Sequence, residues 1–526
     1  MNFVALGKTY LLGLALVFGF AAGSFARPKN IILMIGDGMG PQQIGMADLY
    51  KRYATSSDKK PLAMRTIMNA GSNGIVMTEP YGHLVVDSAC SASQYATGQY
   101  ALSETLGLDH RGDPVETILE LAKKKGKSTG LVSDVRLTHA TPAAFIAHVA
   151  HRSMENEIAE QILASQADVL LSGGIRHFLP QTVNDKNSPA YQDALKMIGY
   201  KEMIRSKRKD QKNLLEQAIK GDYQLVFDRQ GLSSVKKGRL LGLFAYSEMQ
   251  DGITHTQTKS SSSRTEPTLK EMTVKALDVL SQNPKGFFLM VEGGQIDWAG
   301  HENDAGLLLH EMLKFDETVA YVFDWVKKRK DTLVVFTADH ETGSFGFSHS
   351  LAGVPAPVKV SGKAFGEMLH QPGYNFAPLS LLDRIYAQKI GQKAFFNKFM
   401  ARPDGEKTAK NLLAAINSHF SFRLEERQMS AFLNLVPNPF YDETDPYLDD
   451  KETVEIKDFH VFYGLMQNNY STRLARELAS QQNVVWGTGT HTSTPVVLGA
   501  YGDGHRRFAG MMHSTEVGQR LIALIR

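Results

Sequence analysis

The sequence is nearly without cysteine: Cys90 stands alone among 526 residues. A single cysteine cannot form an intrachain disulfide, so the packing of the core has to stabilise the fold. Cys90 lies within a run of small residues, Ser88-Ala89-Cys90-Ser91-Ala92. We expect it to be a small buried hydrophobic side chain there rather than a reactive thiol.

A strong excess of one charge is also absent. The formal net charge is +3, with 21% charged and 43% hydrophobic residues, which is an ordinary globular composition. The chain shows no basic stripe and no coiled-coil heptads. These absences argue against nucleic acid and anionic membrane surfaces as partners.

Hydrophobic runs long enough to span a membrane are missing as well. The longest lies near the N-terminus, from Leu11 to Ala22, with Lys8 before it and Ser24-Phe25-Ala26 after it. About a dozen apolar residues fit the core of a signal peptide, whereas a bilayer span needs ~20. We therefore predict a signal peptide at 1–26 and an exported, periplasmic or secreted protein with no membrane span. An uncleaved N-terminal anchor is the alternative.

The rest of the chain alternates strand-like and helix-like stretches. Short apolar runs indicate strands at 30–35, 128–133, 167–171, 286–291, 332–337 and 495–499, and helical periodicity covers 114–125 and 303–328. This alternation predicts an α/β fold with a large, mostly parallel central sheet flanked by helices, in one domain at 27–526. The more polar stretch at about 345–482, with helical patterns at 406–418 and 460–480, predicts a long inserted cap or crown region or a dimer contact. Residues 206–263 are interpreted as a second, smaller excursion of the chain away from the sheet.

Two of the segments that directly follow predicted strands carry candidate ligand side chains in glycine-rich turns. Asp37 lies in Gly36-Asp37-Gly38-Met39-Gly40, which lacks the spacing of either common nucleotide-binding glycine loop. Further along, Glu292 ends a strand, and Asp297 and His301 stand four residues apart. One helical turn would place Asp297 and His301 on the same face, ready to chelate an ion, rather than as a capping loop with a surface ion pair.

Three further segments add a hydroxyl, an arginine and more ligands. Ser88 could open a helix and present its hydroxyl at the N-terminus, or simply follow an Asp–Ser cap. Arg152 could hold a tetrahedral oxyanion through its planar fork, although a lone arginine is ordinarily a solvated charge. The remaining candidate ligands are His139, Thr141, Asp339, His340 and His491.

Together these side chains predict a metal-assisted reaction at the carboxyl edge of the sheet. Histidines with carboxylates suit zinc, and an oxygen-rich set suits magnesium. Paired ions ~4 Å apart can hold the attacking and leaving oxygens of a phosphoryl transfer, and a serine beside them is a nucleophile.

The ordered set of motifs, with the DSACSAS stretch at 87–93, resembles the alkaline phosphatase family from about Asn30 to the C-terminus. The resemblance implies a homodimeric enzyme that hydrolyses many phosphate monoesters through a phosphoserine, using two zinc ions and one magnesium ion per subunit. It assigns the nucleophile to Ser88 and phosphate binding to Arg152. By the same resemblance, the first zinc is bound by Asp297, His301 and His491; the second by Asp37, Asp339, His340 and Ser88; and the magnesium by Asp37, Thr141 and Glu292.

Two positions depart from the best-known bacterial pattern. His139 stands where that enzyme has an aspartate near the magnesium, and Trp298 where it has a lysine near the phosphate; other members carry similar substitutions. We expect His139 to soften the third site's preference for magnesium, and Trp298 to speed phosphate release. The alternatives are a phosphodiesterase, sulfatase or cofactor-independent phosphoglycerate mutase on the same scaffold, or a non-catalytic exported phosphate- or metal-binding protein.

Overall fold

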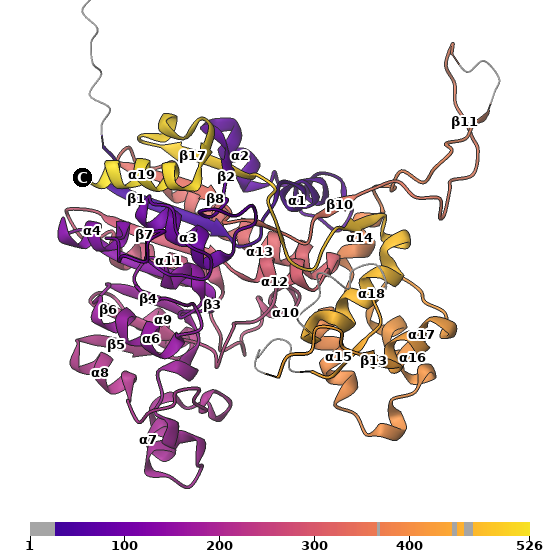
Figure 1. Ribbon diagram of the computed structural model, residues 1–526. Helices are drawn as coiled ribbons and strands as arrows, with labels where there is room; N and C mark the ends of the chain where they lie inside the picture. The colour runs from indigo at the N-terminus through magenta and orange to yellow at the C-terminus, as the bar shows by residue number, and fades with distance from the viewer. Residues whose placement is uncertain (1–26, 365–368, 444–449, 457–465) are drawn as a thin grey trace, which may run out of the picture.

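A computed structural model describes residues 27–364, 369–443, 450–456 and 466–526. Its centre is a sheet of ten strands, with helices on both faces (Figure 1). Across the sheet the strands are β18 (Gly510–His513), β2 (Ser72–Met77), β17 (Val496–Gly502), β8 (Thr332–Thr337), β1 (Asn30–Gly36), β7 (Phe287–Gly293), β3 (Ser128–Arg136), β4 (Val169–Gly173), β6 (Arg239–Leu243) and β5 (Tyr223–Val226).

The middle of the sheet is built from strands that are buried on both faces. Every residue of β1, β7 and β8 is buried, and β1 pairs in parallel with both neighbours, with Ile31 opposite Phe288 on one side and Leu333 on the other. Parallel strands covered on two faces have to be apolar throughout, which is why they stand out as continuous apolar runs in the sequence. The predicted large, mostly parallel sheet is confirmed.

Two sets of helices cover this sheet. On one face, α11 (Leu269–Leu280) packs on β3 and β4, and α13 (Ala305–Val326) packs on β7 and β8. On the other face, α3 (Ser88–Thr97), α4 (Ile118–Lys124) and α19 (Ser514–Ile525) pack together. The long helix α13 begins at Asp304, whose carboxylate accepts the Leu307 N–H and caps the first turn.

The edges of the sheet differ from the sequence prediction in two ways. Strand β17 returns antiparallel to β8 and β2, in the region where sheet character was expected, but β2 was not predicted because its six residues are short and half exposed. The segment at 206–263, interpreted as an excursion from the sheet, instead supplies its edge strand β5 and the neighbouring strand β6. The apolar part of β6 is only about four residues long, which is the lower limit of the strand signal.

The long segment before His491 leaves the sheet and returns through a two-stranded ribbon. Strand β10 (Phe345–Phe347) pairs with β15 (Val484–Trp486), and a helical group stands between them in sequence and beside the sheet in space (Figure 1). Its helices are α14 (Leu381–Tyr386), α15 (Gln392–Met400), α16 (Ala409–His419), α17 (Glu426–Leu433) and α18 (Met466–Gln482). Buried phenylalanines on α15, α17 and the α16–α17 connection give the group a core of its own, and α14 packs on α1 (Pro41–Tyr53) and α13.

The predicted signal peptide, 1–26, lies outside the described residues, as does the first part of the helix expected at 460–480. Among the described residues, none of the helices combines the length and the apolar character needed to cross a bilayer.

Candidate functional site

The candidate ligands meet where the parallel strands end. Asp37 follows β1, Glu292 lies at the end of β7, and Asp339 and His340 come just after β8. Because β7, β1 and β8 are neighbours and parallel, these side chains share one edge of the sheet. Three groups there have ligand atoms within 4.8 Å of one another: Asp297, His301 and His491; Asp37, Asp339 and His340; and Asp37, His139 and Glu292.

The first metal group, Asp297 with His301 and His491, joins one turn of helix to a distant strand. In α12 (Gln295–His301), His301 Nε2 lies 3.3 Å from Asp297 Oδ2, and His491 Nε2 lies 3.2 Å from His301 Nε2. Each imidazole is oriented by a backbone carbonyl: Gly489 O is 2.7 Å from His301 Nδ1, and Val86 O is 2.8 Å from His491 Nδ1. Such bonds place the proton on Nδ1 and leave Nε2 free as a ligand.

The second metal group, Asp37 with Asp339 and His340, lies beside the candidate nucleophile. His340 Nε2 is 3.5 Å from Asp37 Oδ1 and 3.4 Å from Asp339 Oδ2, and Ser88 Oγ is 3.1 Å from the same nitrogen. Ser88 is the first residue of α3, and Asp87 caps that helix by accepting backbone N–H groups. The buried serine hydroxyl therefore stands at a helix N-terminus, where the dipole favours an alkoxide or a phosphate.

The third metal group, Asp37 with His139 and Glu292, shares its aspartate with the second. Thr141 Oγ1 donates to Asp37 Oδ2 at 3.4 Å, and Ser133 Oγ donates to Glu292 Oε2 at 2.5 Å. These hydroxyls orient the two carboxylates. Every predicted ligand thus belongs to one of the three groups or contacts one of their members.

The electrostatics of these groups fit bound cations. Burial, followed by the charges of Asp339, Asp297 and Glu292, raises the pKa of Asp37 well above its usual range. Burial likewise raises the pKa of Glu292 to about 8 and that of Asp339 to about 7. Buried oxygens of Asp37, Asp339 and Glu292 accept no hydrogen bond from the protein. A cluster of buried, incompletely paired carboxyls is costly unless a cation neutralises it, so the donor set fits metal ions.

The pKa values of two histidines and one aspartate are lowered instead. Burial lowers the pKa of His340, and it lowers that of His491 to about 4, so both imidazoles are neutral and able to act as ligands. Burial alone would raise the pKa of Asp297, but the neighbouring His301 and the other histidines hold it well below its usual range. The Asp297 carboxylate is therefore ionised.

The predicted phosphate-binding residues border these groups. Arg152 Nη1 lies 3.3 Å from Asp87 Oδ2, and Arg152 Nη2 lies 3.3 Å from His139 Nε2. Its side chain is 25% exposed, so it reaches both the site and the solvent. Trp298 is partly exposed, and its ring is 6.1 Å from that of His139, centre to centre.

Sequence reasoning missed the side chains that support the ligands. Thr342 Oγ1 donates to Asp297 Oδ1 at 2.5 Å and lies 3.2 Å from His340 Nδ1, so it links the first and second metal groups. Asp87 caps α3, as the Asp–Ser pattern allowed, but its contact with Arg152 was not anticipated. Each of the two side chains lies within one or two residues of a predicted site residue.

Comparison with known proteins identifies the family of this chain. The family described as "Alkaline phosphatase" matches residues 28–526. "Alkaline phosphatase 3" of Bacillus subtilis is 30% identical over 505 residues, covering 94% of this chain and 88% of the relative. "Alkaline phosphatase 4" of the same organism is 36% identical over 328 residues, a match that spans 61% of this chain and 63% of that relative's length. The crystal structure of Thermus thermophilus alkaline phosphatase superposes with a TM-score of 0.72 at 25% identity, covering 96% of this chain and 94% of that one. The chain therefore belongs to the alkaline phosphatase family, whose members are metal-dependent phosphomonoester hydrolases.

Proposed function

We propose that this chain hydrolyses phosphate monoesters of broad specificity through a phosphoserine formed on Ser88. The observation that carries the proposal is the position of Ser88 Oγ, which is at a helix N-terminus and 3.1 Å from His340 Nε2 in the second metal group. Family membership and the three adjoining metal groups support the same activity.

The residues present fit two zinc ions and one magnesium ion. The first metal group has two histidines and one carboxylate, and the second has two carboxylates and one histidine, both of which suit zinc. The third has two carboxylates, with the Thr141 hydroxyl nearby, which suits magnesium, although His139 makes this set softer. Bound there, the ions would supply Lewis-acid stabilisation of the attacking and leaving oxygens and of the water that follows.

The chain's own residues would then carry out two displacements. Ser88 loses its proton and its Oγ attacks phosphorus, forming the serine–phosphate bond as the bond to the leaving alcohol breaks and that oxygen takes up a proton. Water then attacks the phosphoserine, which releases inorganic phosphate and returns the Ser88 hydroxyl. Arg152, with two N–H groups on one plane, binds the phosphate oxygens in both steps. Because the alkoxide forms more readily at higher pH, we expect an alkaline optimum.

Acid-quenched enzyme should yield a peptide phosphorylated on Ser88 after brief exposure to an aryl phosphate. Ser88→Ala should lose both that peptide and at least about a thousandfold in kcat, because the nucleophile is gone. Ser103→Ala, an exposed serine on the following loop, is the matched control and should retain both. Full turnover by Ser88→Ala would refute the phosphoserine.

Substrate preference distinguishes this proposal from the alternative reactions on the same scaffold. We expect an aryl phosphate to be hydrolysed much faster than its methyl diester or the corresponding aryl sulfate, because Arg152 and the three metal groups match a dianion. Preference for the diester or the sulfate would make the chain a phosphodiesterase or sulfatase instead. Metal content by mass spectrometry, with activity before and after chelation, tests the three ions and distinguishes an enzyme from a binding protein.

We also propose that the protein is exported after removal of 1–26, with 27–526 as its catalytic domain, and that it forms a homodimer. The apolar run from Leu11 to Ala22 supports cleavage and export. N-terminal sequencing of the mature protein tests the first proposal, since a start well away from Arg27 would contradict it. Light scattering tests the second, since the mass of one chain would contradict it.

A further inference from the structure

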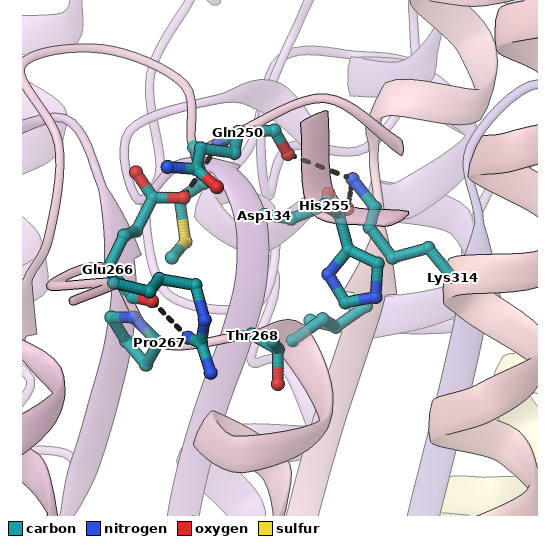
Figure 2. Close-up of a pocket in the computed structure, with 10 residues that line it drawn as sticks. Asp134, Gln250, His255, Glu266, Pro267, Thr268 and Lys314 are labelled. Carbon is teal, nitrogen blue, oxygen red and sulfur yellow. Dashed lines mark hydrogen bonds and ion pairs between the residues drawn. The ribbon is translucent and has the colours of Figure 1, made fainter. Parts of the chain in front are cut away.

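A buried ion pair joins the end of β3 to helix α13 behind the metal groups. Lys314 Nζ lies 3.0 Å from Asp134 Oδ2 and 2.6 Å from Glu311 Oε2, and these three side chains are 4%, 3% and 1% exposed. Lys314 Nζ also donates to the backbone oxygen of Gln250 at 3.3 Å, as Figure 2 shows. Burial would lower the pKa of Lys314, but Asp134 and Glu311 raise it above its usual value, so it is a cation.

Stability alone does not account for such a pair. Replacing a buried ion pair with apolar side chains of similar volume is often neutral or stabilising, because two charges have been removed from water. A pair of this kind can instead serve to fix the position of what it contacts, so its contacts matter.

Asp134 holds the turn that follows β7. Its Oδ1 accepts the Gly294 N–H at 2.7 Å, and its backbone oxygen accepts Gln295 Nε2 at 3.0 Å. The preceding residue, Ser133, donates to Glu292 Oε2. Three hydrogen bonds therefore join the end of β3 to the segment from Glu292 to Gln295.

This segment supplies ligands to two different metal groups. Glu292 belongs to the third, and Asp297, five residues later, belongs to the first. The turn between them packs closely: a Cβ on Gly294 would lie 2.7 Å from Val135 Cγ1. A small tilt at Gly294 would therefore change the position of Glu292 relative to Asp297.

We propose that Lys314 and Asp134 are positioning residues for the metal centre. The ammonium of Lys314 fixes the Asp134 carboxylate on the Gly294 N–H, and this contact sets the spacing between the first and third metal groups. The inference rests on the proposed metal-dependent function and assigns a role in it to two residues that touch neither metal nor substrate.

The test measures how fast metal leaves the full-length protein. Lys314→Met keeps the length of the side chain and removes its charge. We expect zinc and magnesium transfer to an excess chelator to be about tenfold to hundredfold faster, the range typical for loss of residues that orient metal ligands. Lys270→Met is the matched control: this lysine is 39% exposed, pairs with Glu317 at 3.4 Å and lies outside the network, so metal transfer should be unchanged.

A second substitution separates positioning from general destabilisation. The double variant Lys314→Met/Asp134→Asn removes the charge left unpaired beside Gly294 and keeps an acceptor for the Gly294 N–H, while Glu311 stays as it is in the single variant, so the rate of metal transfer should return toward that of the parent. If Lys314→Met does not fold, Asp134→Ala, which lacks the acceptor, should show the same acceleration.

Unchanged metal transfer in a folded Lys314→Met or Asp134→Ala protein would overturn the proposal, even if the midpoint of thermal unfolding falls. So would a double variant that loses metal as fast as the single one. A parent protein that holds no metal would instead refute the proposed function, so the two failures are distinguishable.

Discussion

Removing the metal ions should make the stability of the protein depend on pH in a defined direction. In the metal-free fold, burial raises the pKa of Asp339 to about 7 and that of Glu292 to about 8. Above about pH 6.5 the unfolded chain has lost both protons, whereas the fold holds the proton of Asp339 up to about pH 7 and that of Glu292 up to about pH 8. The folded state binds more protons, so the free energy of unfolding falls as pH rises through these values.

The size of the effect follows from the same pKa values. Each carboxyl contributes about 1.4 kcal/mol per pH unit while it is protonated only in the folded state. Starting from about pH 6.5, Asp339 contributes over about half a pH unit and Glu292 over about one and a half pH units. The free energy of unfolding is therefore lower by about 3 kcal/mol at pH 8. Asp37, whose pKa is also raised, acts in the same direction. In the metal-loaded protein these carboxylates are ionised ligands and take up no protons.

The assay is urea unfolding of chelated and reloaded protein at three pH values across this window. The gap in free energy between the two forms should widen by about 3 kcal/mol as pH rises. Carboxyls outside the site, such as the buried Glu302, titrate alike in both forms and cancel. In Glu292→Gln the widening should shrink to less than about 1 kcal/mol, the share of Asp339. A gap that stays constant or narrows in the parent protein would refute the reasoning.

Three further predictions concern single side chains. Thr342→Val removes a hydrogen bond to the ionised Asp297, worth about 1.5–3 kcal/mol, so chelator competition should show metal held about tenfold to hundredfold less tightly; equal retention would contradict the role of the hydroxyl. Gly38→Ala should lower the thermal midpoint and the metal content, because φ is +72° and a Cβ would lie 2.6 Å from the Asp297 Cα. Gly82→Ala, at φ +77° with open space around it, should cost only the backbone strain of about 1–2 kcal/mol, and equal effects of the two would count against the clash. Trp298→Lys should strengthen inhibition by inorganic phosphate about tenfold by adding a cation near Arg152, and an unchanged inhibition constant would exclude this explanation of the tryptophan.

The predictability of this fold from its sequence followed the burial of each strand. Strands such as β1 are apolar at almost every position because both faces are covered, so their pattern is unmistakable. Strands at or next to the edges of the sheet, such as β5 and β2, are short and partly exposed, and their place in the sheet depends on neighbours far away in sequence. Periodicity within a short window carries no information about those neighbours.

The residues of the site also differ in how far the sequence could indicate them. Candidate ligands that directly follow an apolar strand, such as Asp37 and Asp339, could be expected to lie close together because parallel strands end at a common edge. The supporting roles of Thr342 and Lys314 could not be predicted, since a threonine in a short strand and a lysine in a helix are ordinary. Only the three-dimensional arrangement shows that Lys314 is buried with its charge paired.

The pairing of β16 (His491–Thr492) with β9 (Glu341–Thr342) has a consequence for the order in which the protein matures. His491 enters the first metal group only after the chain has passed through the whole helical group and returned to pair with β9. A nascent or truncated chain that stops before this return already contains Ser88, Asp37 and Asp297, yet its first metal group lacks a histidine. Such fragments would carry the nucleophile without a complete metal pair, so catalytic competence arises late, when almost the entire polypeptide is in place.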